Sequence, residues 1–540
     1  MSTVTSFTSE RILQIEENTI VDAAVVGDDL ILTKHDATTI NAGNVRGAAG
    51  SDGVNGIDGV QGPQGPAGTP FTKWVEASVA NYPTIDPTGV ADSTSALSAA
   101  AAAAVALNGT LVIPPGTYRV DSRVTITLND NQGLHVIAHG ATFVCGSTST
   151  SQGRLFRVVN TVGTTRTVTT IVEAITTANE YGFNNIWRTT LTCSTTPTGI
   201  VAGDYVRVFA DNAVEGADID VRVGQTCSVV AVSGNNVVVS GVLRDNFSTN
   251  PRLARLSAAQ FTWSGGNFTD SAAILAASVG CGELIETRLL IRPRLENMSF
   301  INVMGPAIRT RHSYAWRMDD IQFRWLHNQS SAVYGYGIND DGEFGIATRI
   351  HAERVRHAYT TASETWVNGA VEQFGRAYGT KIINGVGHGC MAATWDTHGD
   401  AEGIEFYGCT SVDGEGAYHF RGRKCRVFGG TVRGPHQGAV VTCDDTSSGG
   451  ISQGHYISGL VIEDVTGDIF VCSNATDGPA TAPSYFVDCT ILSRDTTKYI
   501  FKAVDSIIHH RDIGVAAGGT RALKTGTGSI SLMVTAADTA

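Results

Sequence analysis

The chain between residues 89 and 120 reads Gly89-Val-Ala-Asp92-Ser-Thr-Ser-Ala-Leu97, an alanine-rich run to Leu107, and Asn108-Gly-Thr-Leu-Val-Ile-Pro-Pro-Gly-Thr-Tyr-Arg-Val120. Asp92 is a suitable N-cap, alanine is the strongest helix former, and Asn108 with Gly109 supplies the left-handed residues that end a helix. A strand at 111–113 follows, and Pro-Pro-Gly-Thr turns the chain into a second strand at 118–120. The segment predicts a short capped helix that leads directly into β-structure.

This order of elements resembles the start of the pectate-lyase-like right-handed parallel β-helices, a superfamily that includes phage tailspikes. Its usual pattern is G-V-x-D-D-T-x-A-[IL], followed by G-x-[LIV]-x-[LIV]-P-P-G-x-Y. The chain departs from this pattern at Ser93, where the family has a second Asp. The resemblance implies an all-β coil whose first turn is covered by the helix, because an open parallel edge needs a cover.

A loose repeat further along supports such a coil. It has the form apolar, any, Gly/Asn/Asp, small or apolar, any, and it begins at Trp263 (WSGGN), Leu295 (LENMS), Met318 (MDDIQ), Ile382 (IINGV), Phe406 (FYGCT), Phe428 (FGGTV), Ile457 (ISGLV) and Phe486 (FVDCT). One turn of a β-helix takes about 20 to 30 residues, so the 64-residue gap after Met318 is expected to hide two or three degenerate turns. Asn297 and Asn384 then occupy tight bends, while Ile321, Cys409 and Leu460 point into the coil.

Ahead of the coil, glycine occupies every third position over eight triplets: Gly47, Gly50, Gly53, Gly56, Gly59, Gly62, Gly65 and Gly68. Only glycine fits at the axis of three intertwined polyproline II chains, so this period predicts a collagen-like triple helix at 47–70. The protein is therefore expected to be a homotrimer, with a rod of roughly 70 Å. The alternative is a flexible Gly-rich linker.

Residues 27–46 read as two short strands around a polar turn at 34–37. A hairpin that leads directly into G-X-Y triplets resembles the segment before the collagen-like repeats of bacteriophage minor tail proteins. The resemblance implies that residues 1–46 attach the protein to other tail proteins of a virion. A hairpin closing an extracellular scaffold has the same pattern.

Composition excludes several classes of protein. Lys and Arg total 38 against 51 Asp and Glu, which gives a formal charge of −13 and argues against a nucleic-acid or anionic-membrane partner. The ten cysteines form no C-x-x-C pair, so buried thiols are expected and a zinc site is not. No signal peptide or 18-residue apolar run is present, which favours a phage virion component over a bacterial surface adhesin.

The remaining domain boundaries are placed where the sequence repeat of the coil begins, breaks and ends. Residues 71–120 are expected to hold a linker, the helix and the first strands, and 121–154 the early turns. Residues 155–256 break the repeat with Val-rich strands around Ser233-Gly-Asn-Asn236, which predicts an inserted antiparallel β module. The main β-helix is expected at 257–496, and a C-terminal cap or tail at 497–540.

The densest polar cluster runs from Thr394 to Glu405. If the strand stays extended, Asp396, His398, Asp400 and Glu402 share one face. Carboxylates beside an imidazole suit acid/base cleavage of a glycosidic bond, so these four are the candidate catalytic residues. Ala-Thr-Trp-Asp-Thr-His-Gly resembles a rung of phage tail β-helix proteins, and residues 419–423 are expected to stack beside it one turn later. A hydrogen-bonded ladder between turns has the same pattern.

Aromatic and arginine side chains suit stacking on sugar rings, so the candidate glycan-binding residues are Trp316, Trp325, Trp395, Arg421 and Arg423. A trimer interface is enriched in the same residues. A second acidic group, Asn339-Asp-Asp-Gly-Glu343, is typical of a turn, and a cation-binding or sugar-facing loop has the same pattern.

Three functions remain. The first is a tail fibre or tailspike-like protein of a phage virion that adheres to a host-surface polysaccharide. The second adds glycoside hydrolase or lyase activity against that polysaccharide, and the third is a structural spacer or bacterial surface adhesin. No cofactor, metal, nucleic acid or membrane insertion is expected in any of them.

Overall fold

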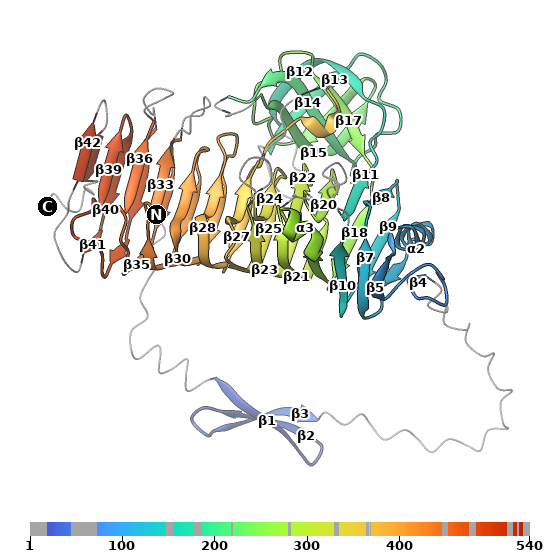
Figure 1. Cartoon of the computed structure of the whole chain (residues 1–540), viewed down its shortest axis with the longest axis horizontal. Helices are drawn as coiled ribbons and strands as arrows, with labels where there is room; N and C mark the ends of the chain where they lie inside the picture. Colours follow the sequence, from blue (N-terminus) through green and yellow to red (C-terminus); the bar gives the residue numbers. More distant parts are fainter. Residues whose placement is uncertain are drawn as a thin grey trace. The chain divides into compact units, whose positions relative to one another are not determined.

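The protein was described from a computed structural model covering residues 19–44, 73–146, 155–176, 186–215, 217, 220–278, 282–328, 334–362, 367, 369–444, 452–474, 482–515, 522–525 and 529–532 (Figure 1). The chain separates into two compact units, residues 1–70 and residues 71–540. The G-X-Y segment at 47–70 and its eight glycines lie outside the described residues.

The first unit is a three-stranded antiparallel sheet of β1 (Ile20–Val26), β2 (Asp29–Lys34) and β3 (Thr39–Asn44). The expected hairpin corresponds to β2 and β3, and β1 pairs with the other edge of β2. The side chains of Val25, Leu30, Leu32 and Ile40 share one face, because Val25 opposes Leu30 and Leu32 opposes Ile40. Every residue of the three strands is exposed or half-buried, so this apolar face is uncovered within residues 19–44.

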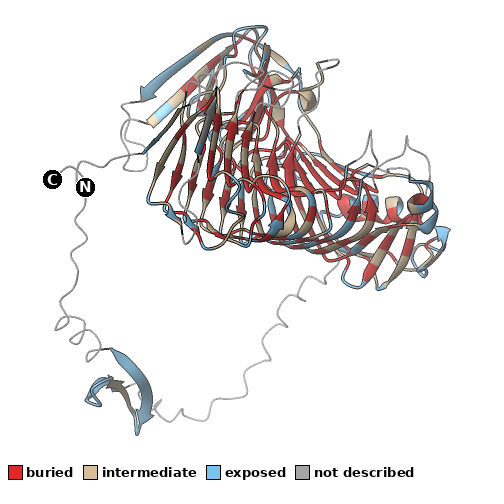
Figure 2. Ribbon diagram, turned by 60° about the vertical axis from the view of Figure 1, so that its left-hand side comes forward, coloured by how far each residue is buried: buried red, intermediate tan, exposed pale blue. Residues whose placement is uncertain are grey.

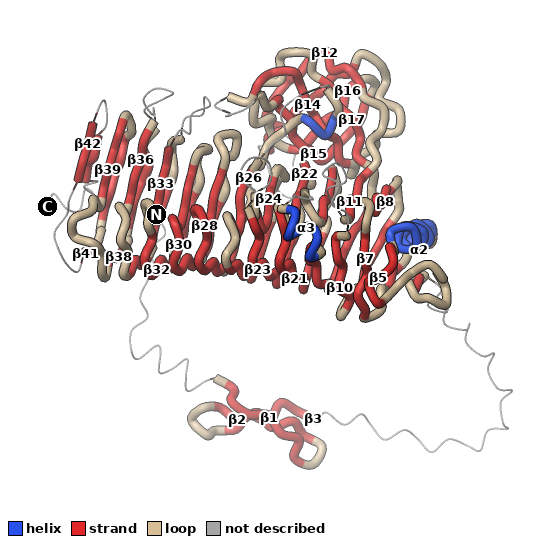
Figure 3. Tube along the Cα trace, viewed as in Figure 1, coloured by secondary structure: helices blue, strands red, loops and turns tan. Residues whose placement is uncertain are grey.

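Within its described residues, the second unit is a parallel β-helix of 34 strands that wind around one core in three faces. The strands stack side by side along the coil in Figure 3. The first face stacks β4 (Trp74–Glu76), β6 (Thr110–Val112), β9 (Gly133–Ile137), β18 (Gln260–Ser264), the starts of β21 (Arg294–Met304), β23 (Arg317–His327) and β25 (Ile346–Glu353), then β27 (Lys381–Ile383), β29 (Glu405–Tyr407), β31 (Arg426–Phe428), β34 (Tyr456–Ser458), β37 (Ser484–Val487), β40 (Ile507–Arg511) and β43 (Ser529–Leu532).

The second face stacks β5 (Thr88–Asp92), β7 (Gly116–Val120), β10 (Ala141–Cys145), β19 (Asn267–Asp270), the ends of β21, β23 and β25, the starts of β28 (Val386–Thr397) and β30 (Thr410–Phe420), then β32 (Thr431–His436), β35 (Val461–Glu463), β38 (Thr490–Ile491) and β41 (Gly514–Val515). The third face stacks β8 (Val124–Leu128), β11 (Phe156–Asn160), β20 (Ile285–Arg288), β22 (Ile308–Arg311), β24 (Tyr336–Asp340), β26 (His357–Thr361), the ends of β28 and β30, then β33 (Val441–Asp444), β36 (Phe470–Ser473), β39 (Phe501–Val504) and β42 (Ala522–Thr525).

Two columns of left-handed residues form corners of the coil. The first column has φ between 52° and 68° at Asn297, Asp320, Arg349, Asn384, Gly408, Gly429, Gly459, Asp488 and Asp512. The second has φ between 51° and 72° at Arg292, Ala315, Phe344, Gly379, Gly403, Lys424 and Gly454. Asn, Asp and Gly adopt this conformation most readily, which explains the third position of the sequence repeat.

The repeat holds along the coil, with one correction to its register. Met318 aligns with Ala347, and Ala347 aligns with Ile382, so the 64-residue gap spans two turns, within the expected two or three. The repeat that begins at Ala347 was hidden because its corner residue is Arg349, which breaks the Gly/Asn/Asp rule. Phe406 aligns with Val427 and not with Phe428, because the corner of that turn is Gly429. Ile321, Cys409 and Leu460 are fully buried, as expected.

Helix α2 (Thr94–Ala106) lies at the first turns of the coil and buries Leu97, Ala100 and Ala104 against them. The N-cap of this helix is Ser93 and not Asp92, because Asp92 is the last residue of β5. The Asp92 carboxylate nevertheless accepts a hydrogen bond from the Thr94 amide at 3.0 Å. Asn108 ends the helix with a φ of 50°. At the other end, β39 (Phe501–Val504) to β43 (Ser529–Leu532) continue the parallel ladder, so the described residues between 501 and 532 extend the coil beyond the expected boundary at 496.

A six-stranded closed antiparallel barrel is inserted between β11 and β18. Its strands are β12 (Arg166–Thr176), β13 (Ile186–Cys193), β14 (Tyr205–Ala213), β15 (Arg222–Ser233), β16 (Asn236–Ser240) and β17 (Arg252–Leu256). The expected start of the inserted module at residue 155 is too early. β11 belongs to the coil, because it pairs in parallel with β8 and β20. Two short helices, α3 (Ala272–Ala277) and η2 (Val371–Gln373), complete the described elements.

Buried ion pairs fasten the barrel to the coil. The guanidinium of Arg207, from β14, contacts the carboxylate of Glu343, and both side chains are fully buried. Arg244 reaches the other oxygen of Glu343 at 3.1 Å, and Arg376 of the coil lies 2.8 Å from Asp245 of the barrel. Breaking such a pair leaves an uncompensated buried charge, so these contacts attach the barrel to the coil.

The core runs along the inside of the coil, as the continuous band of buried residues in Figure 2 shows. Stacked aromatics fill it: Phe268 packs on Phe300 with ring centroids 4.8 Å apart, and Phe470 packs on Phe501 at 5.5 Å. The barrel has a separate core. All nine cysteines among the described residues are buried and free, as expected for core thiols.

Candidate functional site

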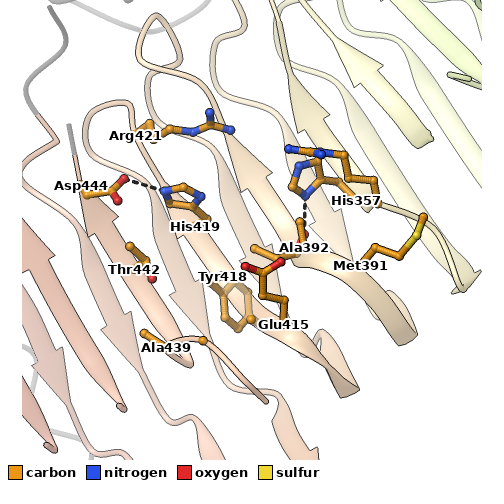
Figure 4. Close-up of a pocket in the computed structure, with 14 residues that line it drawn as sticks. His357, Met391, Ala392, Glu415, Tyr418, His419, Arg421, Ala439, Thr442 and Asp444 are labelled. Carbon is orange, nitrogen blue, oxygen red and sulfur yellow. Dashed lines mark hydrogen bonds and ion pairs between the residues drawn. The ribbon is translucent and has the colours of Figure 1, made fainter. Parts of the chain in front are cut away.

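A pocket of about 430 Å³ opens on the third face of the coil, over β26, β28, β30 and β33 (Figure 4). It is lined by Arg356, His357, Met391, Ala392, Ala393, Glu415, Gly416, Tyr418, His419, Arg421, Gly438, Ala439, Thr442 and Asp444. We call it the histidine pocket. Its lining mixes charged, aromatic and small side chains, which is typical of a site for a polar ligand.

Strand alternation places the polar groups of this pocket. Trp395 and Tyr418 are paired and point into the core, so the next residues, Asp396 and His419, are paired on the outer side. The expectation that residues 419–423 stack beside the Asp396 rung one turn later is confirmed at His419. Arg421, two residues after His419 in the chain, also contacts the Asp396 carboxylate.

Asp396 is the centre of the charge network below the pocket. Its fully buried carboxylate lies 2.6 Å from Arg421 and 3.4 Å from His419, and it accepts a 2.5 Å hydrogen bond from the Thr360 hydroxyl. Burial alone would raise the pKa of Asp396, but the nearby positive charge of Arg421, with His357, His419 and His398, holds it well below its usual range. Asp396 is therefore a permanent buried anion that positions the groups above it.

His419 joins this buried anion to the surface. Its Nε2 lies 2.6 Å from Asp444 Oδ1 (Figure 4). Its Nδ1 lies 3.4 Å from the Asp396 carboxylate. The side chains of His419 and Asp444 are 22% and 28% exposed. Asp396, His419 and Asp444 thus form a chain of polar side chains from the interior to the pocket, which we call the relay, and in it the imidazole orients Asp444.

His357 forms a buried wall of the pocket. Its Nδ1 lies 2.5 Å from the carbonyl oxygen of Ala393, and its ring stands 5.3 Å from that of Tyr336. Burial lowers the pKa of His357 to about 4, against the opposing pull of Asp396. Burial also raises the pKa of Tyr336 to about 12. Both side chains are therefore neutral near pH 7.

The four candidate catalytic residues do not share one face. β28 ends at Thr397, and the chain turns through His398 to Ala401, where the Ala401 amide donates to the His398 carbonyl oxygen at 3.0 Å. His398 stays beside Asp396 at 3.8 Å, but Asp400 is buried in the turn. Glu402 belongs to another cluster, 2.7 Å from Arg376. The extended-strand assumption was wrong because of this turn.

The candidate glycan-binding residues also separate. Trp316 and Trp395 are buried in the core, where neither can stack on a sugar, and Trp316 donates its indole N–H to Asp340 at 3.1 Å. Trp325 is 36% exposed on the second face, away from the histidine pocket. Arg421 lines the pocket. Arg423 instead lies 3.5 Å from Glu402.

The acidic group at 339–343 is a buried network and not an exposed turn. Asp340 accepts hydrogen bonds from the Tyr359 hydroxyl at 2.8 Å and the Thr380 hydroxyl at 2.7 Å, inside the coil. Burial raises the pKa of Asp340, while these donors oppose the shift. Asp341 pairs with Arg309 at 3.0 Å. Glu343 forms the buried ion pair with Arg207 that attaches the barrel to the coil. These carboxylates are structural.

Glu415, Asp444, Arg356 and Met391 line the pocket without having been predicted. Val-Thr-Cys-Asp444 carries no local motif, so only the rung register, with Tyr418 opposite Val441, would have indicated it. Among the described residues, no three His, Cys, Asp or Glu side chains are grouped closely enough to hold a metal ion. None of the described helices has the length and apolar character needed to cross a membrane.

Comparisons with known proteins give similarity in fold alone. No protein-family model matches the sequence, and no curated protein does. The solved tailspike protein gp49 from Pseudomonas phage LKA1 is 17% identical with a TM-score of 0.51, and the match covers 85% of this chain and 77% of that one. Tailspike gp61 of Pseudomonas phage phi297 is 14% identical, with a TM-score of 0.49 and coverage of 84% and 69%. The gp54 tailspike of Acinetobacter baumannii bacteriophage AP22, solved with a capsular saccharide, is 13% identical, with a TM-score of 0.48 and coverage of 81% and 74%.

Proposed function

We propose that this chain is a tailspike-like component of a phage tail and that its histidine pocket binds a host-surface polysaccharide. The observation that carries the proposal is the Asp396–His419–Asp444 relay, which rises from the core to a polar pocket of about 430 Å³. Arg421, Arg356 and Glu415 add hydrogen-bonding groups at its rim, and a sugar chain offers hydroxyls or carboxylates to all of them. The likeness of the coil to the gp49 tailspike supports the same role.

A binding measurement tests this proposal. Wild-type protein is expected to bind at least one member of a panel of purified capsular polysaccharides and lipopolysaccharide O-antigens on a microarray. Glu415→Gln is expected to weaken binding to that glycan, whereas Glu463→Gln, which removes a half-buried carboxylate from β35 outside the pocket, is expected to leave it unchanged. Equal binding by Glu415→Gln and wild type would contradict the proposal.

Cleavage of the bound glycan is the second candidate function. Two carboxylates line the pocket: Asp444, oriented by His419, and the exposed Glu415. One can protonate the leaving oxygen while the other activates water, as a hydrolase requires, or either can act as the base of a lyase. Asp396 and His398 take a positioning role in this scheme, because Asp396 is fully buried.

Asp444→Asn separates binding from cleavage. If the pocket is catalytic, wild-type protein releases reducing ends from the glycan that it binds, and Asp444→Asn loses at least about a hundredfold in rate, the contribution of a general acid or base. The matched control is Asp413→Asn, which alters an exposed His–Asp pair between β28 and β30, where Asp413 lies 3.2 Å from His388. Absence of reducing ends with a bound glycan would restrict the function to adhesion.

The proposed assembly is a homotrimer attached to other tail proteins through residues 1–46. Two features support it: the eight G-X-Y triplets and the uncovered apolar face of β1, β2 and β3 immediately before them. Three copies held by a triple helix would bring three such faces together, and burying them would remove Val25, Leu32 and Ile40 from water. The proposed location is the tail of the virion.

A further inference from the structure

A row of aromatic side chains lies where the barrel meets the coil, and a pocket opens at its Tyr205 end. Four aromatic side chains form a continuous row there: Tyr205 of β14, then Tyr314, Phe344 and Tyr378 on successive rungs of the coil. Their ring centroids are 5.4, 5.7 and 5.4 Å apart. We call this row the junction track. Its coil side follows the rungs of Ile291, Tyr314, Glu343 and Tyr378, about 14 Å at a strand spacing of about 4.8 Å.

Phe344 is in an unfavourable backbone conformation for its size. Its φ is 54°, whereas the next corner residues in the same column are Gly379 and Gly403. A β-carbon added at Gly379 would lie 3.0 Å from the Phe344 ring, so the glycine leaves the space that the ring occupies. The side chain is nevertheless 44% exposed. Phe344 therefore presents part of its ring to solvent at a corner that glycine would occupy without strain.

Polar groups continue the track at both ends. Arg292 donates a 2.9 Å hydrogen bond to the Tyr205 hydroxyl, beside a pocket of about 370 Å³ that also includes Asp204, Gln260 and Thr262. At the other end the Arg244 guanidinium lies 4.0 Å from the ring centroid of Tyr378. Aromatic faces between hydrogen-bonding side chains match a chain of sugar rings, which presents apolar C–H faces and hydroxyl edges.

Attachment of the barrel does not account for the exposed ring. The buried contacts of Glu343 with Arg207 and Arg244 fasten the barrel, and Phe209 packs on Phe374 with centroids 4.9 Å apart. Phe344 contributes to none of these contacts. Its exposed surface remains available to a ligand in the single chain.

We propose that the junction track is a second glycan-binding subsite, in which pyranose rings of a host-surface polysaccharide stack on Phe344 and Tyr205. This inference rests on the proposed function in its choice of ligand but uses residues outside the histidine pocket. The track extends the contact of one long polysaccharide beyond the pocket, so it contributes to the affinity for polymer and not for a fragment that only fills the pocket.

Two full-chain variants separate the two sites, using the same panel of capsular and O-antigen polysaccharides and their di- and trisaccharide fragments. Phe344→Gly removes the ring without backbone strain. It is expected to weaken polymer binding by about tenfold, to leave fragment binding unchanged and to keep or raise the melting temperature. Ala439→Trp fills the histidine pocket and is expected to abolish fragment binding. The matched control is Trp325→Gly, another exposed aromatic at positive φ, 55°, on the second face, and it is expected to have no effect.

Each outcome discriminates. Unchanged polymer binding by Phe344→Gly, with loss in Ala439→Trp, overturns the track and leaves the proposed function intact. Loss in Phe344→Gly alone supports the track and overturns the pocket as the glycan site. A lower oligomer mass for Phe344→Gly assigns the ring to a subunit interface, and equal loss in Trp325→Gly assigns the effect to neither site; both overturn the inference. Absence of binding by wild-type protein overturns both sites.

Discussion

His312, His357 and His455 are imidazoles held inside the protein without a charge. Burial lowers the pKa of His312 and of His455 to about 3, and that of His357 to about 4. Each makes hydrogen bonds that a neutral ring can satisfy; His455, for example, accepts the Cys425 amide at 3.2 Å. Protonation of any of them places a charge in a site that offers it little solvation.

The free energy of unfolding is therefore expected to fall as the pH drops from 6.5 to 4. In this window the unfolded chain protonates these histidines and the folded protein does not, so each contributes a slope of about 1.4 kcal/mol per pH unit. Below pH 3.8 protonation of Asp396, whose pKa is depressed in the folded state, adds to the loss. Denaturation midpoints measured from pH 7 to pH 4 give the slope.

His357→Gln is expected to reduce this slope by the share of one histidine, whatever its effect at pH 7. His351→Gln, at an exposed position on β25, is the control and is expected to leave the slope unchanged. A pH-independent stability of wild-type protein between 6.5 and 4 would show that these imidazoles are not held neutral.

At the level of residues, the sequence predicted half of the candidate site. Asp396 and His419 were indicated because the Trp-Asp-x-His rung and the segment 419–423 are polar between apolar positions. Glu415 and Asp444 were not indicated by the sequence, because their proximity to His419 depends on how turns of unequal length align. Trp316 and Trp395 were misassigned because an aromatic residue reads the same in the core and on the surface.

Corner residues connect the sequence repeat to the elements of the coil. Arg349 carries an exposed side chain at a φ of 52° and pairs with Asp319 at 2.5 Å. A left-handed conformation costs a non-glycine residue about 1 to 2 kcal/mol, while an exposed ion pair contributes about 1 kcal/mol or less. The corner at Arg349 is therefore retained at a cost in stability.

Arg349→Gly is expected to melt at or above the temperature of wild-type protein. Arg433→Gly removes a similar exposed ion pair, with Glu463 at 2.6 Å, from the middle of β32, and is expected to lose about 1 kcal/mol. Thermal unfolding followed by circular dichroism compares the two variants. An equal loss in both would contradict a left-handed corner at Arg349.

The barrel depends on one buried carboxylate. Glu343→Gln is expected to destabilise its attachment by about 3 to 5 kcal/mol, because Arg207 remains buried without a counter-charge. Limited proteolysis should then release a fragment near residues 161–257 that wild-type protein retains. Glu353→Gln, which affects an exposed pair with Arg324 at 3.0 Å, is the control. Resistance of Glu343→Gln equal to that of the control would show that other contacts hold the barrel.

The elements were predicted where local rules dominate. The capped helix, the β2–β3 hairpin and most corners follow from alanine, turn residues and left-handed Asn or Gly. β1 was overlooked because Ile20–Val26 buries no residue and so lacks alternation. β40 was overlooked because His510, which aligns with Phe486, takes the apolar position that begins the repeat.

At the scale of the whole molecule, the apolar face of the N-terminal sheet tests the trimer. Leu32→Cys in the full chain is expected to give cross-linked dimers and trimers with a short bismaleimide. Thr33→Cys, which points to the opposite face of β2, should remain monomeric on denaturing gels. The nine native cysteines among the described residues are buried and should not react. Cross-linking at Thr33 but not at Leu32 would place the subunit contact elsewhere.

The most direct test of the account is the affinity of wild-type protein and of Ala439→Trp for the glycan selected from the polysaccharide panel, measured by isothermal titration calorimetry. Ala439 lines the histidine pocket without joining its charge network, so the substitution fills the pocket and leaves Asp396, His419 and Asp444 paired. The account predicts saturable binding by wild type and its loss in Ala439→Trp, with an unchanged melting temperature. Equal affinities would contradict it.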